Sequence, residues 1–320
     1  MPVTTPSPAA PFTVEHTAQP WLLNAGQTSA CLAYPALAEE IVRLLLDASV
    51  QVPPRMVLAL PGGGSLFVMP AFDDRVAISK LITFTPANAA AARPSIQGDV
   101  VVFDTVTGER RLILDGPTVT ARRTAAVSLL AAQRLAPEPC GPLLVVGAGV
   151  QGRAHLEAFA QGLGVQDVMV SSRNPASAAR LVAYAQSLGL RAQMAPDANA
   201  ALAHCPLVVT CTPAREIALS ALPRNDAFIA AVGAFTPQMV ELDAALCRHV
   251  ARTGRVVVDT ADAIHEAGDL LQAGLDVTRF GTLRDVIRSP AKKSTGPVLF
   301  KSCGWAGWDL AAARLALRQI

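Results

Sequence analysis

Two patterns of apolar and polar positions divide the chain. Between residues 56 and 115 the apolar residues form short runs, and the turn-forming segments PGGG, DD, QGD and TGE separate them. The runs are MVLAL, SLFVM, AISKLITF, VVFDT and RLILD. Short runs with turns at these intervals predict an antiparallel sheet of hairpins. Helical spacing of apolar residues precedes this stretch at 34–50 and follows it at 118–135, where a helix is predicted in each case.

From residue 143 onward the predicted strands are apolar throughout and alternate with helices. The strands are LLVV, VMVSSR, LVVTCT, AFIAAVG and VVVDT, and the helices between them include 153–163 and 175–188. Continuous apolar strands are typical of a parallel sheet that helices cover on both faces. From residue 298 the sequence predicts a short strand, a glycine turn and a terminal helix.

These patterns predict an α/β protein with a Rossmann-type, doubly wound parallel sheet and a smaller α+β domain. A chain of 320 residues is long enough for two domains. We expect a flexible N-terminal extension over 1–20, because this segment is rich in proline and threonine. The α+β domain is expected over 21–125, completed by 299–320, and the Rossmann domain over 126–298.

Composition narrows the classes of partner. The formal net charge is +2 and no basic segment is interleaved with aromatic residues, so a small molecule is a better partner than nucleic acid or a membrane. The N-terminus has no signal-peptide pattern, and no apolar run reaches the ~18 residues of a membrane span. Six scattered cysteines without zinc spacing predict free thiols, no metal site and a reducing, cytoplasmic location.

A glycine motif follows the first predicted strand of the parallel sheet and opens a helix: Gly147-Ala148-Gly149-Val150-Gln151-Gly152. In this G-x-G-x-x-G pattern, Gly147 permits the tight turn and Gly149 lets the backbone approach a pyrophosphate. Gly152 lets the helix pack closely on the sheet, and the unpaired N–H groups of the helix start favour an anion. We therefore expect residues 147–152, Val150 and Gln151 included, to bind a dinucleotide.

The second predicted strand of this domain ends in Ser171-Ser172-Arg173-Asn174. An NAD site usually has an Asp or Glu here, which accepts hydrogen bonds from the ribose hydroxyls. No carboxylate is present to repel a 2′-phosphate, and the guanidinium can pair with it. Ser172, Arg173 and Asn174 therefore favour NADPH, with NADH binding more weakly. The alternative is an exposed arginine that merely follows a strand.

Outside the glycine motif, the candidate chemistry consists of cations in the first domain. Arg55, Lys80 and the adjacent pair Arg122-Arg123 would together suit a substrate carboxylate, and a solvated surface is the alternative for each. Adjacent residues of a helix point about 100° apart, so only one of the two arginines can readily face a given site. His155 is expected to pack or to contact the helix end, and the other histidines lie in no catalytic motif.

The chain resembles the ornithine cyclodeaminase/mu-crystallin family over nearly its whole length. The matching segments are Pro54-Arg55, Met69-Pro70-Ala71, the Lys80 strand, residues 120–126, Gly147–Gly152, Val232-Gly233-Ala234 with Pro237, Glu241-Leu242-Asp243, Glu266-Ala267-Gly268-Asp269 and residues 300–304. The resemblance implies a Rossmann domain joined to a substrate domain that forms a homodimer.

The resemblance also implies roles for single residues. Arg55, Lys80 and Arg123 would bind the substrate carboxylate, whereas Thr212 and Gly304 would lie near the cofactor. Arg122, the other arginine of the pair, would then face solvent or a dimer partner.

Two departures from the cyclodeaminases of that family bear on the activity. Those enzymes have an acid at the position of Phe67 and an Asp at the position of Phe235. Phenylalanine can neither accept a proton nor pair with an ammonium group, but it can line an apolar pocket. Because the family's ketimine reductases also lack these acids, the resemblance implies NADPH-dependent reduction of Δ1-pyrroline-2-carboxylate and Δ1-piperideine-2-carboxylate to L-proline and L-pipecolate. Lys80 is the candidate proton donor to the imine nitrogen, and water is the alternative.

Three other functions stay open at this stage. The first is a cyclodeaminase-type lyase that retains and recycles NAD, against which Phe67, Phe235 and Ser172 argue. The second is an alanine dehydrogenase-like oxidoreductase on the same scaffold. The third is a mu-crystallin-like protein that binds NADPH without turnover.

Overall fold

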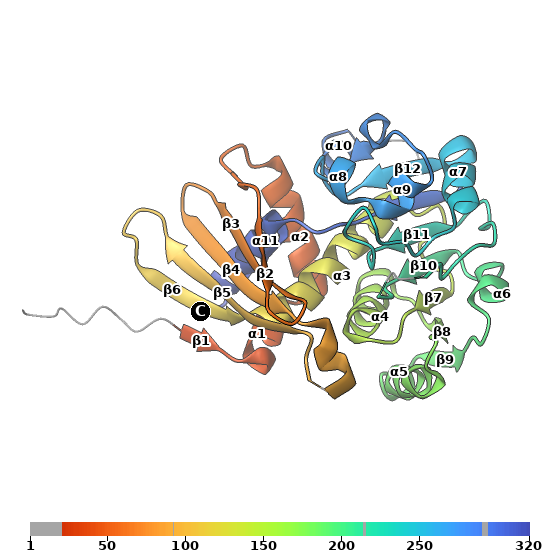
Figure 1. The fold of residues 1–320 in the computed structure, drawn as a ribbon, viewed down its shortest axis with the longest axis horizontal. Coiled ribbons are helices and arrows are strands. Elements are labelled where there is room, and N and C mark those ends of the chain that lie inside the picture. Colours follow the sequence, from red (N-terminus) through yellow and green to blue (C-terminus); the bar gives the residue numbers. More distant parts are fainter. Residues whose placement is uncertain (1–20, 92, 214–215, 290–293) are drawn as a thin grey trace, which may run out of the picture.

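The computed structural model describes residues 21–91, 93–213, 216–289 and 294–320. The extension expected over 1–20 lies outside the described residues. Two sheets, one mostly antiparallel and one parallel, make up the molecule and lie side by side (Figure 1). No described helix combines the length and the apolar character that a membrane span requires.

The first sheet has six strands in the order β1-β6-β5-β4-β3-β2. They are β1 (Trp21–Leu23), β2 (Met56–Leu60), β3 (Gly64–Phe72), β4 (Val76–Phe84), β5 (Ile96–Asp104) and β6 (Arg110–Asp115). Strands β2 to β6 pair antiparallel, which confirms the predicted hairpin sheet. Strand β1, which was not predicted, adds in parallel to β6; its three residues are too few for a periodic signal.

Helices cover one face of this sheet. They are α1 (Ala25–Cys31), α2 (Tyr34–Leu46), α3 (Gly116–Leu135) and α11 (Ala306–Leu317), and the short helix η1 (Pro86–Ala91) joins β4 to β5. Helices α3 and α11 contact the sheet directly, and α2 packs on both of them (Figure 1). The sheet side chains that face these helices are buried, as the pairs Met69 and Ala71 of β3 and Val100 and Val102 of β5 show.

The second sheet has eight strands, all paired in parallel, in the order β13-β12-β14-β11-β10-β7-β8-β9. They are β7 (Leu143–Val146), β8 (Asp167–Ser171), β9 (Arg191–Met194), β10 (Leu207–Thr210), β11 (Phe228–Ala231), β12 (Arg255–Val258), β13 (Gly281–Thr282) and β14 (Val298–Lys301). This arrangement confirms the predicted α/β class with a Rossmann-type sheet.

The helices of the second unit lie on both faces of the parallel sheet. They are α4 (Val150–Leu163), α5 (Pro175–Ser187), α6 (Ala198–Leu202), α7 (Ala244–Thr253), α8 (Ala263–Glu266), α9 (Gly268–Gln272), η2 (Val277–Arg279) and α10 (Leu283–Arg288). Along β7, Leu143 and Val145 enter one buried cluster, whereas Leu144 and Val146 enter another. This double burial explains why the strand is apolar throughout.

One hydrophobic core joins the two units. The cluster that contains Leu143 and Val145 also contains Val100 of the first sheet and the buried face of α3. Helix α3 packs closely on α4, where a Cβ added at Gly162 would lie 2.4 Å from the Leu129 side chain. Apolar packing along α3 therefore joins the two units through one continuous core.

Two of the expected domain boundaries fall inside secondary-structure elements, helix α3 and strand β14. Helix α3 runs without a break across residues 125 and 126, where one boundary was expected. Residues 299–301, expected with the first unit, belong to β14 and pair with β11 and β12 inside the parallel sheet. The sequence of a four-residue apolar strand does not indicate which sheet it joins. That is decided by the strands with which it pairs in the folded chain. Helix α11, which follows, packs on the first sheet.

The environment of Arg122 corrects an expectation. This side chain, expected to face solvent or a partner, is only 13% exposed. Its Nε donates to the Leu32 carbonyl at 2.7 Å, and its guanidinium lies 4.0 Å from the centre of the Tyr34 ring. It also forms an ion pair with Glu157 at 3.7 Å. Helices α1, α2 and α4 surround α3, so the chain itself covers the side of α3 that the sequence pattern left open.

Candidate active site

A cavity of about 230 Å³ lies between the two units. The parallel sheet contributes residues that follow the carboxyl ends of its strands: Gln151 after β7, Thr212 after β10, Phe235 after β11 and Gly304 after β14. From β7 the chain runs outward to β8 and β9 and returns to β10 on the other side of β7. A crevice opens at such a switch point, and ligands of open α/β sheets bind there.

The structure brings Arg55, Lys80 and Arg123 together on the wall of this cavity. Lys80 comes from β4, Arg123 from α3, and Arg55 from the segment before β2. The Lys80 Nζ lies 3.0 Å from Asp309 Oδ1, and the Arg123 Nε lies 3.3 Å from the same oxygen. Lys80 and Arg123 are therefore arranged around a carboxylate that α11 supplies.

Asp309 is a site residue that the sequence analysis missed. It is fully buried, and its Oδ2 has no hydrogen-bond partner among the described residues. The signal that was available is a lone acid in the apolar helix AGWDLAAARLAL. A buried carboxylate requires a cation or several donors, so such a residue indicates a charged partner elsewhere in the fold.

Opposing effects of burial and of neighbouring charges determine the pKa of Lys80. Burial lowers the pKa of its ammonium group to about 8, although the Asp309 carboxylate opposes this shift. The nearby positive charges of Arg123 and Arg55 lower the pKa further. Lys80 is thus mostly protonated at neutral pH, yet it can release a proton far more easily than an exposed lysine can.

The rest of the cavity is largely apolar. Phe67 of β3 and Phe235 after β11 both line it, one from each unit. The Phe235 ring packs edge-on against Phe84, with 6.3 Å between ring centres. Ile82 and Met69 complete this part of the wall. The cavity therefore has a cationic wall and an aromatic wall.

The glycine turn after β7 has the shape of a dinucleotide cradle. Gly147 has a φ of 113°, and a Cβ there would lie 2.7 Å from the Cys211 carbonyl oxygen. A Cβ at Gly152 would lie 2.0 Å from the Gly147 oxygen, whereas beside Gly149 no atom lies within 4 Å. No side chain caps the start of α4. The open backbone at Gly149 and the free N–H groups of α4 fit a pyrophosphate.

The neighbouring positions of the turn also suit a ligand. Val150 is 71% exposed at the start of α4. Gln151 lines the cavity, and its side-chain Oε1 is buried without a hydrogen-bond partner among the described residues. The backbone carbonyl oxygen of Gln151 lies 2.8 Å from His155 Nδ1.

His155 has the packing role that was expected. It is fully buried, and its Nε2 lies 3.0 Å from the Ser128 hydroxyl. Burial lowers its pKa to about 4, so the imidazole is neutral at physiological pH. It joins α4 to α3 and does not reach the cavity wall.

The predicted specificity segment lies at the end of β8. Arg173 is exposed and forms an ion pair with Glu216 at 3.1 Å. The Asn174 side-chain oxygen caps α5, accepting from Ala176 N at 3.0 Å. Ser172 accepts a weak 3.4 Å bond from the Asn174 N–H. The Asn174 oxygen therefore caps the helix, whereas the Ser172 side chain is partly exposed and the Arg173 side chain is exposed.

Buried carboxylates hold the two turns that carry Thr212 and Gly304. Glu241 accepts from Thr212 N at 2.6 Å and from Gly233 N at 2.6 Å, so it joins the ends of β10 and β11. Asp259 accepts from Gly304 N and from the two residues before it, each at 2.9 Å. The roles of Glu241 and Asp259 were not predicted, because their partners are distant in sequence.

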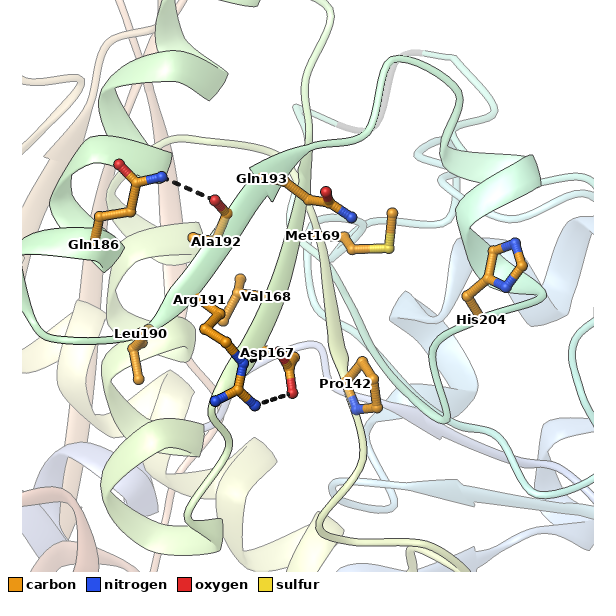
Figure 2. A pocket seen from close by; sticks show the side chains of 10 residues that line it. All are labelled: Pro142, Asp167, Val168, Met169, Gln186, Leu190, Arg191, Ala192, Gln193 and His204. Atoms are coloured by element: carbon orange, nitrogen blue, oxygen red, sulfur yellow. Dashed lines mark hydrogen bonds and ion pairs between the residues drawn. The ribbon is translucent and has the colours of Figure 1, made fainter.

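A second hollow, of about 730 Å³, lies at the amino ends of the parallel strands (Figure 2). Pro142 precedes β7, and the ion-paired Asp167 and Arg191 begin β8 and β9. The glycine turn follows the carboxyl end of β7, so it lies at the other end of the strands. The pair is largely exposed, at 46% and 70%, so it is a solvated surface contact and we assign no site here.

The Lys80 charge can be measured directly, since the chain has four lysines, at 80, 292, 293 and 301. In NMR titrations of protein carrying ¹³C-labelled lysine, the Lys80 Cε signal should titrate with a midpoint near 8. Asp309→Asn removes the charge that favours the ammonium form, so the midpoint should fall. Lys301 is the internal control: burial is the largest single effect and lowers its pKa, but Asp269, Cys303 and Glu241 together raise the pKa overall. A midpoint unchanged by D309N would contradict the proposed coupling.

Comparison with known proteins gives the chain its family. The model of the ornithine cyclodeaminase/mu-crystallin family matches residues 26–319. Delta(1)-pyrroline-2-carboxylate reductase 2 of Burkholderia ambifaria is 39% identical, over 92% of this chain and 94% of that protein. The Delta(1)-pyrroline-2-carboxylate/Delta(1)-piperideine-2-carboxylate reductase of Azospirillum brasilense is 38% identical, with the same coverage. Ketimine reductase mu-crystallin of Mus musculus is 34% identical, over 84% and 85%.

Solved structures agree in fold. Delta(1)-pyrroline-2-carboxylate reductase of Thermococcus litoralis, in complex with NADH and L-proline, superposes with a TM-score of 0.85. It is 24% identical, and the match covers 93% of this chain and 96% of that one. An archaeal alanine dehydrogenase dimer with bound NAD has a TM-score of 0.82 at 23% identity, over 93% and 95%. By its sequence match and its fold, this chain belongs to the ornithine cyclodeaminase/mu-crystallin family.

Proposed function

We propose that this chain is an oxidoreductase that uses NADPH to reduce cyclic ketimines. The substrates are Δ1-pyrroline-2-carboxylate and Δ1-piperideine-2-carboxylate, and the products are L-proline and L-pipecolate. The observation that carries this proposal is the cavity with a cationic wall of Arg55, Lys80 and Arg123 and an aromatic wall of Phe67 and Phe235. A small flat ring with one carboxylate matches both walls. The names of the relatives that are 38–39% identical support this substrate class.

The lining of the cavity argues against a diamino acid substrate. None of the described residues that line the cavity is acidic. Asp309 lies behind the wall and forms ion pairs with Lys80 and Arg123, and Glu266 forms an ion pair with Arg55. A second substrate ammonium would thus meet Phe67 or Phe235, with no carboxylate to offset a desolvation cost of several kcal/mol. A cyclodeaminase reaction therefore fits the cavity poorly.

The dinucleotide would lie on the 147–152 turn, with Thr212 and Gly304 beside its nicotinamide end. When bound, the reduced nicotinamide supplies the hydride for the imine carbon. Solved proteins of the same fold carry NADH or NAD, which supports a nicotinamide dinucleotide. The preference for NADPH rests on Ser172 and Arg173, since no carboxylate follows β8 at this point and Arg173 can exchange Glu216 for a phosphate.

The chain's own groups can carry out the remaining steps. Arg123 and Arg55 bind the carboxylate, which fixes the ring in one orientation; positioning of this kind contributes up to about 7–11 kcal/mol of barrier lowering. Lys80 then donates a proton to the imine nitrogen, because its pKa of about 8 lies close to the working pH. Asp309 keeps the ammonium group in place and charged.

Replacement of Lys80 by arginine tests the proton step. Lys80→Arg retains the positive charge but cannot release a proton, so kcat for either ketimine should fall roughly 10²-fold or more. Lys80→Ala should raise KM as well, because it also removes a positive charge from the wall that faces the carboxylate. The wild-type rate should decline as the pH rises through about 8, where the donor loses its proton. Near-normal turnover by K80R would mean that water, and not Lys80, donates the proton to the imine nitrogen.

Cofactor choice can be tested at the end of β8. Ser172→Asp places a carboxylate where the 2′-phosphate would bind, so the ratio of kcat/KM with NADPH to that with NADH should fall at least roughly tenfold. Ser177→Asp on the following helix adds the same charge away from the strand end and serves as the control. A ratio unchanged by S172D would refute this placement of the adenosine ribose.

We further propose a homodimer that forms through the uncovered face of the first sheet. Lys80 points into the cavity, so the next residue, Leu81, points outward, and it is 42% exposed. Along the same face, Val68 lies opposite both Leu81 and Met56. Met56 and Leu58 are 53% and 46% exposed. An exposed apolar sheet face of this kind is typical of a protein interface.

The dimer is testable by analytical ultracentrifugation. Leu58→Glu should convert the wild-type dimer to a monomer at micromolar concentration, because a charge on this face would be buried without a partner. Val106→Glu, in an exposed turn of the same sheet, is the matched control and should leave the mass unchanged. A monomeric wild type, or a dimeric L58E, would contradict this interface.

A further inference from the structure

Arg55 is bound by a carboxylate that comes from the opposite unit. Its Nη2 donates to Glu266 Oε1, and the two side chains are 21% and 20% exposed. Arg55 lies on the first unit before β2, whereas Glu266 ends α8 of the second. The contact therefore joins the two units beside the cavity and engages one nitrogen of the guanidinium that the proposed function assigns to the substrate carboxylate.

The two acids next to the cationic wall differ in position. Asp309 is fully buried, and it contacts both Lys80 and Arg123 from behind. Glu266 contacts Arg55 alone among the described cations and is partly open to solvent. A ligand carboxylate that enters the cavity can thus take the place of Glu266 on Arg55, but it cannot displace Asp309.

The backbone at Glu266 is tightly fixed. A Cβ at Gly268 would lie 2.0 Å from the Met239 carbonyl oxygen, so the backbone packs closely on the neighbouring segment here. The next residue, Asp269, is buried and forms an ion pair with Lys301 at 2.9 Å. When Arg55 no longer contacts Glu266, we therefore expect the Glu266 side chain to move or its carboxylate to become protonated.

The charges around Glu266 set its response to pH. Burial raises the pKa of its carboxyl group to about 7, although Arg55 opposes the shift. The carboxylates of Asp259 and Asp262 raise it further, and the Cys303 thiol also faces it. When Arg55 no longer contacts this carboxylate, burial and the charges of Asp259 and Asp262 still act on it. The pKa of Glu266 must then increase.

We propose that Glu266 is a positioning residue that competes with the substrate carboxylate for Arg55, so that substrate binding takes up a proton and tightens as the pH falls. The inference rests on the proposed function for the class of ligand. Above neutral pH Glu266 is ionised and has to be displaced from Arg55. Below neutral pH it is protonated and leaves Arg55 free. The residue thereby makes the affinity for the carboxylate depend on pH.

The test uses pyrrole-2-carboxylate, a flat five-membered ring whose nitrogen does not titrate near neutral pH. Its binding to the full-length protein with NADP⁺ is measured by calorimetry between pH 6 and 8.5, in buffers of different ionisation enthalpy. The difference between buffers gives the protons taken up. Wild type should take up protons near neutral pH, and its Kd should rise by roughly tenfold from pH 6 to pH 8.

Two variants isolate Glu266. Glu266→Gln should bind roughly tenfold more tightly than wild type at pH 8 and equally at pH 6, with fewer protons taken up. Lys80 can also take up a proton when an anion binds, so the difference between wild type and E266Q is the relevant quantity. Asp262→Asn retains the pair but removes a like charge, so it should move the transition to lower pH.

Three results would overturn the inference. Equal proton uptake by wild type and E266Q would make the pair a static contact, and weaker binding by E266Q would mean that Glu266 helps to hold the ligand. Absence of carboxylate binding by wild type would remove the ligand for which Glu266 is said to compete. Turnover is assayed separately with both ketimines: a wild type that shows the proton uptake but reduces neither ketimine rejects the reductase and leaves the competition at Arg55 supported.

Discussion

The buried carboxylate of Asp309 is the interaction on which the arrangement of the site depends. Lys80 and Arg123 lie on different elements of the first unit, and both are nearly or fully buried. A buried ammonium or guanidinium group without a counter-charge costs several kcal/mol. The C-terminal helix α11 must therefore return from the parallel sheet to the first sheet to bring Asp309 between them. This return also carries the turn of Ser302 to Gly304 into the cavity.

Further buried carboxylates fix the remaining walls of the cavity. Glu241 joins the ends of β10 and β11, and Asp259 holds the backbone turn after β14. Each accepts several hydrogen bonds from the turn that it holds, so the turns that line the cavity are preorganised. Glu266 is different, because it has one cationic partner and is partly exposed. The site thus combines fixed acids behind the wall with one acid that can change its partner.

The same arrangement would allow the cavity to carry out the proposed function, in which it binds an anion and supplies a proton. Three cations against Asp309 and Glu266 leave a net positive charge, which suits a ligand with one carboxylate. Burial among these cations brings the pKa of Lys80 down to about 8. Phe67 and Phe235 make the opposite wall apolar, and electrostatic interactions are stronger beside a surface of low polarity.

The sequence by itself determined the two kinds of sheet, the glycine turn and the family. Periodicity and turn residues are local properties, so the strands β2 to β6 and the Rossmann sheet could be predicted without knowledge of their neighbours. Only the tertiary structure decided where β14 pairs, that Arg122 is covered by α1 and α2, and that Asp309 and Glu266 hold the cations. These features join residues as far apart as Lys80 and Asp309. Their charges interact only after the chain has folded, and no local pattern records the partner.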